Sequence, residues 1–561
     1  MVGTPADAVR TRSGVAVTVD FSRGAASAAV VRPETSHPRV SIAEDAPTGR
    51  IVVCLGNVAA LPKMTGSLLA GEERPLREMP AISAAIVWDP HTERLTVATD
   101  RVGNLGLYYR QADGRLVVAS TAELVAAQWP RPAEFDVEAA SEILWMGFLV
   151  SDHTLFRHVR RVPTASIWQF GRHAAAKSTY WEPSFRPGPD DTVERALDTF
   201  GAAVSRSTSG SRTAIALSGG IDTRAIFATV LKLGRKTDGF TSGLAGSADV
   251  RVARRLARHL DGEWHNASVA GEFLDRFQHW AETAVRDSDG TLGVEHAHLA
   301  YLNSLLPGWM DTLVDGGGAE AAKRGLLRRA ARAVGSNAEL KRMLMCEFGK
   351  PEAAGALLGE VEMRRVEERL SSLLEDQLAG VAHSSTGDTL DAFFLRHMWS
   401  GYHGTGVAMQ NQHVGCRLPF LENDFLDALM EVPLGVRERS AVNFLAVRRN
   451  APQLERYPRV WMDIEVPWSN SALLQMTPTL VVKVASRFLQ RPAFPIARWM
   501  TRDLQAQARA ALESFLGRGV ADGRALRRAL AGGQMPVTGS LGRAARLAWR
   551  FDTWFRVFGG V

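Results

Sequence analysis

The first third of the chain alternates short apolar runs with turn residues. The runs are rich in Val, Ile, Leu and Ala, and Gly, Pro and Asp separate them. Such spacing is typical of antiparallel strands joined by tight turns. The clearest runs are residues 15–19, 51–55, 82–88, 95–99 and 116–119. We therefore expect stacked antiparallel sheets that continue to about residue 185.

The pattern changes after Pro-Gly-Pro-Asp-Asp at residues 187–191. Expected strands at residues 214–217, 239–243 and 312–314 then alternate with stretches whose apolar residues recur at helical spacing. This alternation indicates a parallel, doubly wound sheet that binds its ligand at the carboxyl ends of its strands. The predicted fold is thus α/β, with a β-rich domain over residues 1–186 and an α/β domain that contains the parallel sheet over residues 190–561.

Several helices of the second domain have clear signals of their own. The sequence Asp-Thr-Val-Glu at residues 191–194 fits a capping box that opens a helix toward residue 204. A second helix is expected over residues 250–260, where the apolar positions repeat at helical spacing. Residues 326–394 and 472–561 are predicted to be largely helical.

Composition limits the class of protein. With 561 residues, 46% of them hydrophobic, the chain is long enough for two or three globular domains. No run approaches the roughly 20 apolar residues of a membrane span, and the first residues lack the apolar core of a secretory signal. Three widely separated cysteines, Cys54, Cys346 and Cys416, form neither a disulfide framework nor a paired metal motif. A cytoplasmic location is expected.

The net charge of +6 permits an anionic partner. Only 8 of the 66 basic residues are Lys, and the arginines are spread along the chain rather than gathered in one stretch. That distribution favours solvated, arginine-rich helix faces over a nucleic-acid groove. We therefore expect no nucleic-acid partner.

The strongest chemical signal is the sequence Ala-Ile-Ala-Leu-Ser-Gly-Gly-Ile-Asp-Thr-Arg at residues 214–224. An apolar strand runs into Ser218, Gly219 and Gly220, and an apolar helix follows. Glycines let the backbone approach a phosphate closely, and the free N–H groups of a first helical turn attract anions. Asp222 is then placed as a carboxylate ligand for Mg²⁺. Two glycines alone would instead favour an ordinary strand-to-helix turn capped by Ser218.

The whole string resembles the pyrophosphatase loop of the ATP-dependent adenylating synthetases, with Thr223 where that family often has Ser. It lacks the Lys of the other common nucleotide loop, Gly-x-x-x-x-Gly-Lys-Ser/Thr. The resemblance implies attack at the α-phosphate of ATP, with AMP and pyrophosphate as products and Mg²⁺ as the metal. It assigns nucleotide binding to Leu217, Ser218, Gly219, Gly220, Asp222 and Thr223. It also makes Thr241 and Ser242, at the end of the second strand, candidates for contacts with adenine, although strand-end capping explains them equally well.

The first domain has a resemblance of its own. Residues 81–90, 98–109 and 114–120 look like the glutaminase (Ntn-type) domain of asparagine synthetases. That family hydrolyses glutamine with a cysteine at its N-terminus, but position 2 here is Val2, and Cys54 lies within an apolar strand. Without the nucleophile no covalent thioester forms. The domain is therefore predicted to be degenerate, serving as a structural element or a platform for partners.

A second glycine segment follows the strand at residues 312–314. Asparagine synthetases read Ser-Gly-Glu-Gly-x-Asp-Glu at this place, and this chain reads Asp-Gly-Gly-Gly-Ala-Glu-Ala. The resemblance places Gly316, Gly317 and Gly318 at the ligand and gives Glu320 the role of the Mg²⁺-binding Asp. Gly317 stands where asparagine synthetases carry Glu and β-lactam synthetases carry Tyr, so we expect it to leave room for a bulkier substrate. The alternative is a glycine-rich loop with a solvent-facing Glu320.

Two later segments depart from the family pattern. Arg417-Leu-Pro-Phe-Leu-Glu422 resembles the family's Arg-x-Pro-Phe-Leu-Asp, so Arg417 either reaches a phosphate or pairs with Glu422. Residues 457–468 occupy the place of Arg-x-Lys-x-Gly-Phe-x-x-Pro, whose Lys stabilises developing negative charge in the family. That Lys is missing here, and Arg459 is our hypothesis for its catalytic replacement.

Taken with the absent cysteine nucleophile, these departures resemble the lasso peptide cyclases most. Those enzymes adenylate an Asp or Glu side chain of a precursor core peptide and close a macrolactam with its N-terminal amine. The resemblance implies a leader-binding protein and a leader peptidase as further partners. Two alternatives stay open: an amide or β-lactam synthetase that acts on a small carboxylic acid, and a non-catalytic scaffold that binds nucleotide or peptide.

Overall fold

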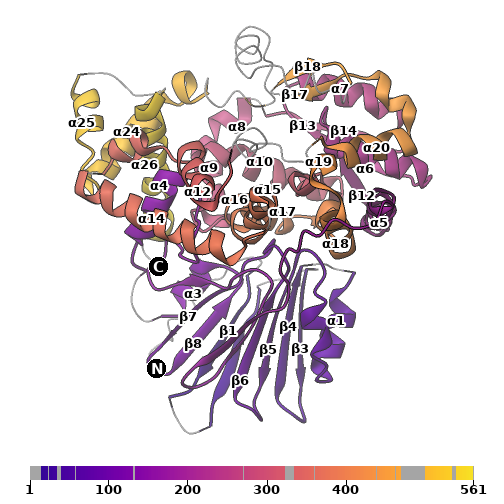
Figure 1. The fold of residues 1–561 in the computed structure, drawn as a ribbon. Helices are drawn as coiled ribbons and strands as arrows, with labels where there is room; N and C mark the ends of the chain where they lie inside the picture. Colours follow the sequence, from indigo (N-terminus) through magenta and orange to yellow (C-terminus); the bar gives the residue numbers. More distant parts are fainter. Residues whose placement is uncertain are drawn as a thin grey trace.

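The computed structural model describes most of the chain. The described residues are 14–22, 25–33, 39–56, 59–129, 133–210, 212–269, 271–322, 334–358, 360–383, 385–437, 439–461, 463–468, 494, 499–532 and 539–559. Val2 lies outside them. Two layered antiparallel sheets form one end of the molecule, and the helix-rich remainder of the chain lies against them (Figure 1).

The N-terminal domain contains the two antiparallel sheets that the sequence predicts. The first has the order β2-β1-β8-β7-β9 and the second β11-β10-β6-β5-β4-β3. The strands are β1 Ala16–Asp20, β2 Ser27–Val31, β3 Val40–Asp45, β4 Arg50–Gly56, β5 Ser83–Asp89, β6 Arg94–Thr99, β7 Tyr108–Ala112, β8 Arg115–Ala119, β9 Arg160–Arg161, β10 Ser166–Phe170 and β11 Ala175–Thr179. All five predicted runs are strands, to within about one residue at either end.

Alternation along the strands builds the core between these sheets. Val17 and Val19 of β1 are buried in one cluster with Val53 and Leu55 of β4 and Val97 of β6. Successive side chains of a strand point to opposite faces, so the intervening residues of β4 face the other way. They pack on the helices α1 Leu61–Leu69 and α2 Arg74–Arg77, which cover the outer face of the six-stranded sheet.

The second domain is built on a five-stranded sheet with the order β14-β13-β12-β15-β16, in which every neighbouring pair is parallel. Its strands are β12 Thr213–Ala216, β13 Asp238–Ser242, β14 Trp264–Ala267, β15 Thr312–Val314 and β16 Gly415–Arg417. Ile215 and Val314 belong to a core cluster on one face, whereas Ala214 and Leu313 belong to a cluster on the other. Helices therefore cover both faces, as a doubly wound sheet requires.

Helices make up most of the rest. They are α3 Ala122–Ala127, α4 Val137–Met146, α5 Thr192–Ser207, α6 Ile221–Lys232, α7 Ala248–Leu256, α8 Gly271–Asp275, α9 Phe277–Asp287, α10 Ala297–Leu305, α12 Asn337–Glu347, α13 Pro351–Gly355, α14 Glu360–Gly380, α15 Thr386–Phe393, α16 Trp399–Tyr402, α17 Gly404–Asn411, α18 Asn423–Glu431, α19 Leu434–Arg437, α20 Ala441–Asn450, α24 Gln505–Gly517, α25 Arg524–Ala531 and α26 Gly539–Phe558. None of the helices in the described ranges combines the length and apolarity of a membrane crossing.

Two local predictions are wrong. Asp191 does occupy the cap position of α5, but its side chain makes no capping hydrogen bond, and its carboxylate lies 3.9 Å from Arg195 instead. The capping box therefore does not form. The α-helix expected over residues 250–260 ends at Leu256. A 3₁₀ turn, Ala257–His259, follows it, as is common at the ends of α-helices.

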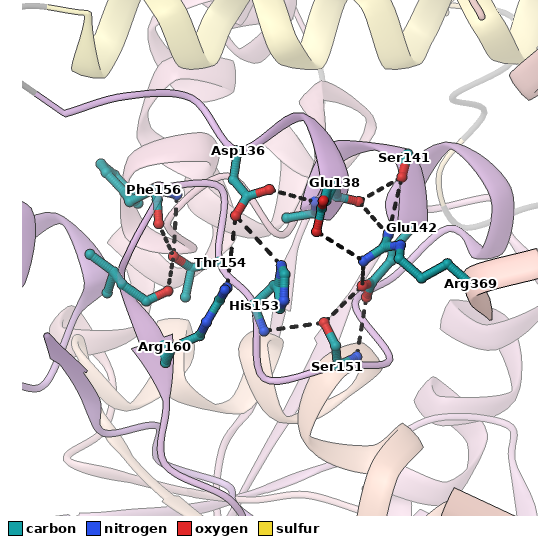
Figure 2. Close-up of polar contacts among 12 residues, drawn as sticks. Asp136, Glu138, Ser141, Glu142, Ser151, His153, Thr154, Phe156, Arg160 and Arg369 are labelled. Carbon is teal, nitrogen blue, oxygen red and sulfur yellow. Dashed lines mark hydrogen bonds and ion pairs between the residues drawn. The ribbon is translucent and has the colours of Figure 1, made fainter. Parts of the chain in front are cut away.

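The two domains are joined by a buried ion pair between α4 and α14 (Figure 2). Arg369 of α14 lies 3.1 Å from Oε1 of Glu142, whose side chain is fully buried. Glu142 also accepts hydrogen bonds from the backbone of Val150 and Ser151 and from the Ser151 hydroxyl. Arg369 further donates to the carbonyl oxygen of Glu138 at 2.8 Å. Both terminal nitrogens of Arg369 thus find acceptors on α4.

Replacing Arg369 by Met should lower the thermal unfolding midpoint clearly, because the change removes the cation that directly contacts the fully buried Glu142 carboxylate. Breaking a fully buried pair typically costs 3–5 kcal/mol, and the partial exposure of Arg369 reduces the expected loss to about 2 kcal/mol. Scanning calorimetry would measure it. Arg157→Met is the matched control, because Arg157 and Glu134 are both more than half exposed. Equal midpoints for the two variants would contradict the prediction.

Candidate functional site

The loop between β12 and α6 is held by hydrogen bonds within itself. The Ser218 hydroxyl lies 2.9 Å from the Thr223 hydroxyl and accepts the Gly220 N–H at 3.1 Å. Gly220, in an extended conformation, is the cap residue of α6, and no side chain caps the helix. The interpretation of Ser218 as an ordinary helix cap is therefore wrong. Leu217 ends the strand and is buried.

Gly219 is required by a neighbouring hairpin. Its carbonyl oxygen accepts the backbone N–H of Val460 at 2.8 Å, and a Cβ at this position would lie 2.2 Å from the Val460 side chain. Val460 belongs to β17 Arg459–Trp461, which pairs with β18 Ile464–Val466. The Gly219 N–H donates to the Asp249 carboxylate at 2.9 Å. Only glycine fits beneath this hairpin, and both of its backbone polar groups are bound by the protein.

Asp222 lies in the first turn of α6, where the sequence predicts it. Its Oδ1 accepts a hydrogen bond of 2.8 Å from the side-chain amide of Asn443, a fully buried residue of α20. The Asn443 Oδ1 is buried and has no hydrogen-bond partner among the described residues. Asn443 therefore orients Asp222 and presents a second oxygen inside the same buried region.

The second glycine segment meets the loop directly. A Cβ on Gly316 would lie 3.1 Å from Cβ of Asp222, so the two segments contact one another there. Asp315 accepts the Gly317 N–H at 2.8 Å. Burial, and then the negative charges of Glu320 and Asp222, raise the pKa of Asp315 despite that hydrogen bond. The structure thus brings Asp222 and Glu320 near one another and adds Asp315 between them.

Carboxylates gathered in this way favour a divalent cation, since like charges in a buried region repel. Within the described ranges, however, no group of three His, Cys, Asp or Glu side chains has the geometry of a metal site. Magnesium binding by Asp222 and Glu320 therefore stays a prediction.

The two candidates for adenine contacts differ. The Thr241 hydroxyl donates to the Leu217 carbonyl oxygen at 2.7 Å and accepts the Trp264 indole N–H at 2.9 Å, and only 3% of Thr241 is exposed. These bonds tie neighbouring strands together. For Thr241 they favour strand-end capping, the alternative to an adenine contact. Ser242 lies partly exposed at the end of β13 and keeps its candidate role as a prediction.

Side chains pack closely against one side of Gly317, where we expect room for a bulkier substrate. A Cβ at this position would lie 3.2 Å from Cδ2 of Leu418 and 3.6 Å from the Trp399 ring. Gly318 has φ +83°, and a Cβ there would lie 2.3 Å from Leu421. The glycines therefore allow this segment to pack against its neighbours. They do not by themselves open a pocket.

Trp399, which packs against Gly317, links this segment to the N-terminal domain. Its indole N–H donates to Oδ1 of Asn104 at 2.8 Å, and both side chains are buried. Asn104 in turn donates through its backbone and side chain to the Asp100 carboxylate. The first domain thus supports the residue that packs on Gly317.

The arginines predicted for this region lie close to it but make few bonds of their own. Arg459 directly precedes Val460, whose backbone N–H is bonded to Gly219, and burial lowers the pKa of Arg459. Burial also lowers the pKa of Arg417. Glu422 lies 3.5 Å from Arg206, and no ion pair between Glu422 and Arg417 is formed. Arg417 and Glu422 therefore act on each other's charge without forming a direct ion pair.

Sequence reasoning missed several residues at the loop. Asp315 had a usable signal, because it is an acidic residue directly after an apolar strand. Asn443 had none, since it lies 221 residues from Asp222. Arg224 and Asp249 were visible only as parts of helices, and their contacts with Gly219 depend on tertiary packing.

Comparison with known families agrees with this organisation. Residues 69–181 match the family described as glutamine amidotransferase domain, and residues 195–448 match the family described as asparagine synthase. Together they support an asparagine synthetase-like family. The pair also confirms the predicted fold class, an Ntn-type domain followed by an α/β domain. The asparagine synthase domain supports an ATP-dependent ligase that forms amide bonds.

Other comparisons add little. No curated protein sequence matches the chain. The structure titled as the allosteric regulatory enzyme of purine biosynthesis matches at 9% identity and TM-score 0.18, over 46% of this chain and 75% of that one. A glutamine phosphoribosylpyrophosphate amidotransferase from B. subtilis matches at 9% identity and TM-score 0.17, over 61% and 74%. At such TM-scores they say nothing about the function of this chain.

Proposed function

We propose that the protein is an ATP-dependent lasso peptide cyclase. It adenylates an Asp or Glu side chain of a precursor core peptide and joins that side chain to the peptide's N-terminal amine, releasing AMP and pyrophosphate. A leader-binding protein and a leader peptidase are its proposed partners. The ligase chemistry has the support of the asparagine synthase match. The formation of a macrolactam goes beyond that match and is part of the proposal.

The observation that carries the proposal is the absence of a side chain at position 317, between Asp315 and Glu320. A Glu or Tyr here serves the better-known relatives in the reaction. Without it, attack is easiest for an amine that belongs to the same molecule as the acyl group. Intramolecular attack replaces an encounter between two molecules and needs less help from side chains.

The cysteines of the chain give this proposal further support. Cys54 lies in β4 with its side chain toward α1, away from the space between the sheets. Burial raises the pKa of the Cys54 thiol to about 11, so the thiol is protonated at neutral pH. A protonated, buried thiol is a poor nucleophile. Loss of glutaminase activity stays a prediction, since Val2 lies outside the described residues, but an amine supplied by the substrate itself fits these facts.

The proposed chemistry has two steps. The peptide carboxylate attacks the α-phosphorus of ATP, and the bond to pyrophosphate breaks. The N-terminal amine then attacks the acyl carbon, the bond to AMP breaks, and a proton leaves the nitrogen. Mg²⁺ would neutralise the departing pyrophosphate. Asp222 and Glu320 are proposed to hold it, and Arg459 to stabilise developing negative charge, where one such donor is typically worth about 3 kcal/mol.

A second candidate function has an observation in its favour. Leu418 and Trp399 pack against one side of Gly317, which restricts the space that a bulky substrate could use there. An amide or β-lactam synthetase acting on a small carboxylic acid needs less space. Substrate size therefore separates the two candidates.

Exchange of labelled pyrophosphate into ATP would decide between them. We expect exchange with peptides that carry a free N-terminal amine and an internal Asp or Glu, together with a product lighter by one water in mass spectrometry. N-acetylated peptides are the matched control, since they should support exchange but not cyclisation. Exchange with small carboxylic acids and with no peptide would favour the second candidate. ATP binding without exchange for either class would indicate a scaffold.

A further inference from the structure

Arg224 is a buried arginine in the first turn of α6, with none of its surface exposed. Its two terminal nitrogens donate to main-chain carbonyl oxygens on both sides of the loop. The shortest bonds reach Pro458 at 2.6 Å and Tyr457 at 2.9 Å, and weaker ones reach Gly219 at 3.3 Å and Leu454 at 3.4 Å. Arg224 thus joins the loop to the segment that leads into the β17–β18 hairpin.

The charge of Arg224 has no acidic partner within the described part of the chain. Its guanidinium stacks 4.5 Å from the Trp468 ring centroid, and the charged group that acts on it is Arg459, of the same sign. Arg437, another buried arginine, contacts both Asp388 and Asp391. An isolated buried charge is costly, and a fold normally pairs it. Carbonyl dipoles solvate Arg224, but they do not neutralise it.

The surroundings of the loop explain why an unpaired cation is useful there. Asp222, Asp249, Asp315 and Glu320 all lie at or beside the loop, and each carboxylate that is ionised would repel a phosphate group. Two arginines placed behind the glycines act in the opposite direction. Opposite charges attract strongly across a poorly solvated region, even when they do not touch.

We propose that Arg224, together with Arg459, supplies the positive charge that draws the phosphates of the nucleotide to the Ser218–Asp222 loop, while its carbonyl contacts hold the Gly219 peptide in place. The proposal rests on the proposed function, since it takes ATP as the ligand. Arg224 is a positioning residue here, because its nitrogens are bound to carbonyl oxygens and do not reach the phosphates.

The test compares ligands that differ only in phosphate number. Arg224→Met should weaken ATP binding by about tenfold or more and AMP binding by less, and should change adenosine binding by no more than about twofold. Arg224→Lys keeps the charge and should recover most of the ATP affinity. Titration calorimetry with Mg·ATP, AMP and adenosine measures all three. Arg550→Met is the matched control. Arg550, in the C-terminal helix α26, is likewise buried and donates to the carbonyl oxygens of Gly290 and Thr291.

The outcomes are separable. If Arg224→Met lost affinity for ATP and adenosine equally, or lost none for ATP, the electrostatic role would be overturned. Arg224 would then only hold the loop in place. If Arg224→Met does not fold, Arg459→Met replaces it, since it leaves the carbonyl contacts intact and should weaken ATP more than adenosine. Equal affinities of that variant and the wild type for ATP would overturn the proposal. Wild-type protein that binds no ATP would instead remove the nucleotide assignment itself.

Discussion

Asp222→Asn should abolish AMP formation while the protein stays folded. The side chain lies at the start of α6, where the Asn443 amide holds its Oδ1, and an asparagine can still accept that hydrogen bond. What the variant loses is the negative charge beside Glu320 and Asp315 that is proposed to bind Mg²⁺–pyrophosphate. Losing a metal carboxylate removes charge stabilisation worth several kcal/mol, so we expect a loss of about a thousandfold or more.

Release of AMP in the presence of substrate, followed by chromatography, measures this effect, and circular dichroism checks the fold. Glu320→Gln should impair the reaction strongly but less completely, since Glu320 lies partly exposed. Asp311→Asn is a suitable control, because Asp311 precedes β15, is largely exposed and pairs with Arg212. A folded Asp222→Asn enzyme that releases AMP normally would remove the central assignment.

Gly317→Tyr should block product formation and leave nucleotide binding nearly intact. The residue packs toward Leu418 and Trp399, so a large side chain has no room on that side and must turn toward the reacting groups or displace the segment. Forced overpacking is costly because a packed site does not relax cheaply. The loop from Ser218 to Asp222 is a separate segment, and its internal hydrogen bonds persist.

A series at this position makes the prediction quantitative. Gly317→Ala should retain most activity, Gly317→Glu should lose much of it, and Gly317→Tyr should fall by about a hundredfold or more. Neither larger residue should restore asparagine or β-lactam synthesis. Calorimetry with ATP and mass spectrometry of the product separate binding from turnover. Wild-type turnover by Gly317→Tyr would mean that the acyl group lies elsewhere.

The order of elements was predictable because the patterns are local. Short apolar runs between turn residues, such as residues 15–19 and 51–55, predicted strands, and the switch to helical spacing after residue 191 marked the second domain. Local signals failed where packing decides. The capping box at residues 191–194 has the right residues, yet Asp191 lies nearest Arg195 and makes no cap.

The site was predictable only where its residues lie in one short stretch of sequence. Ser218 to Asp222 could be found from one stretch, and Glu320 from another. What surrounds them comes from far away: Val460 over Gly219, Asn443 on Asp222, and Leu418 beside Gly317. No spacing rule links positions hundreds of residues apart. The expected pocket at Gly317 stays a prediction for the same reason, since a missing side chain reveals nothing about which neighbours pack against its place.

The bond between Asn104 and Trp399 has a consequence for how the chain can evolve. Trp399 packs beside Gly317, so a change at Asn104 in the first domain alters the packing around Gly317 in the second. A chain shortened to its second half would leave a buried indole N–H without an acceptor, which costs stability. Natural selection on the second domain would therefore also preserve the first, even in a lineage that never uses glutamine.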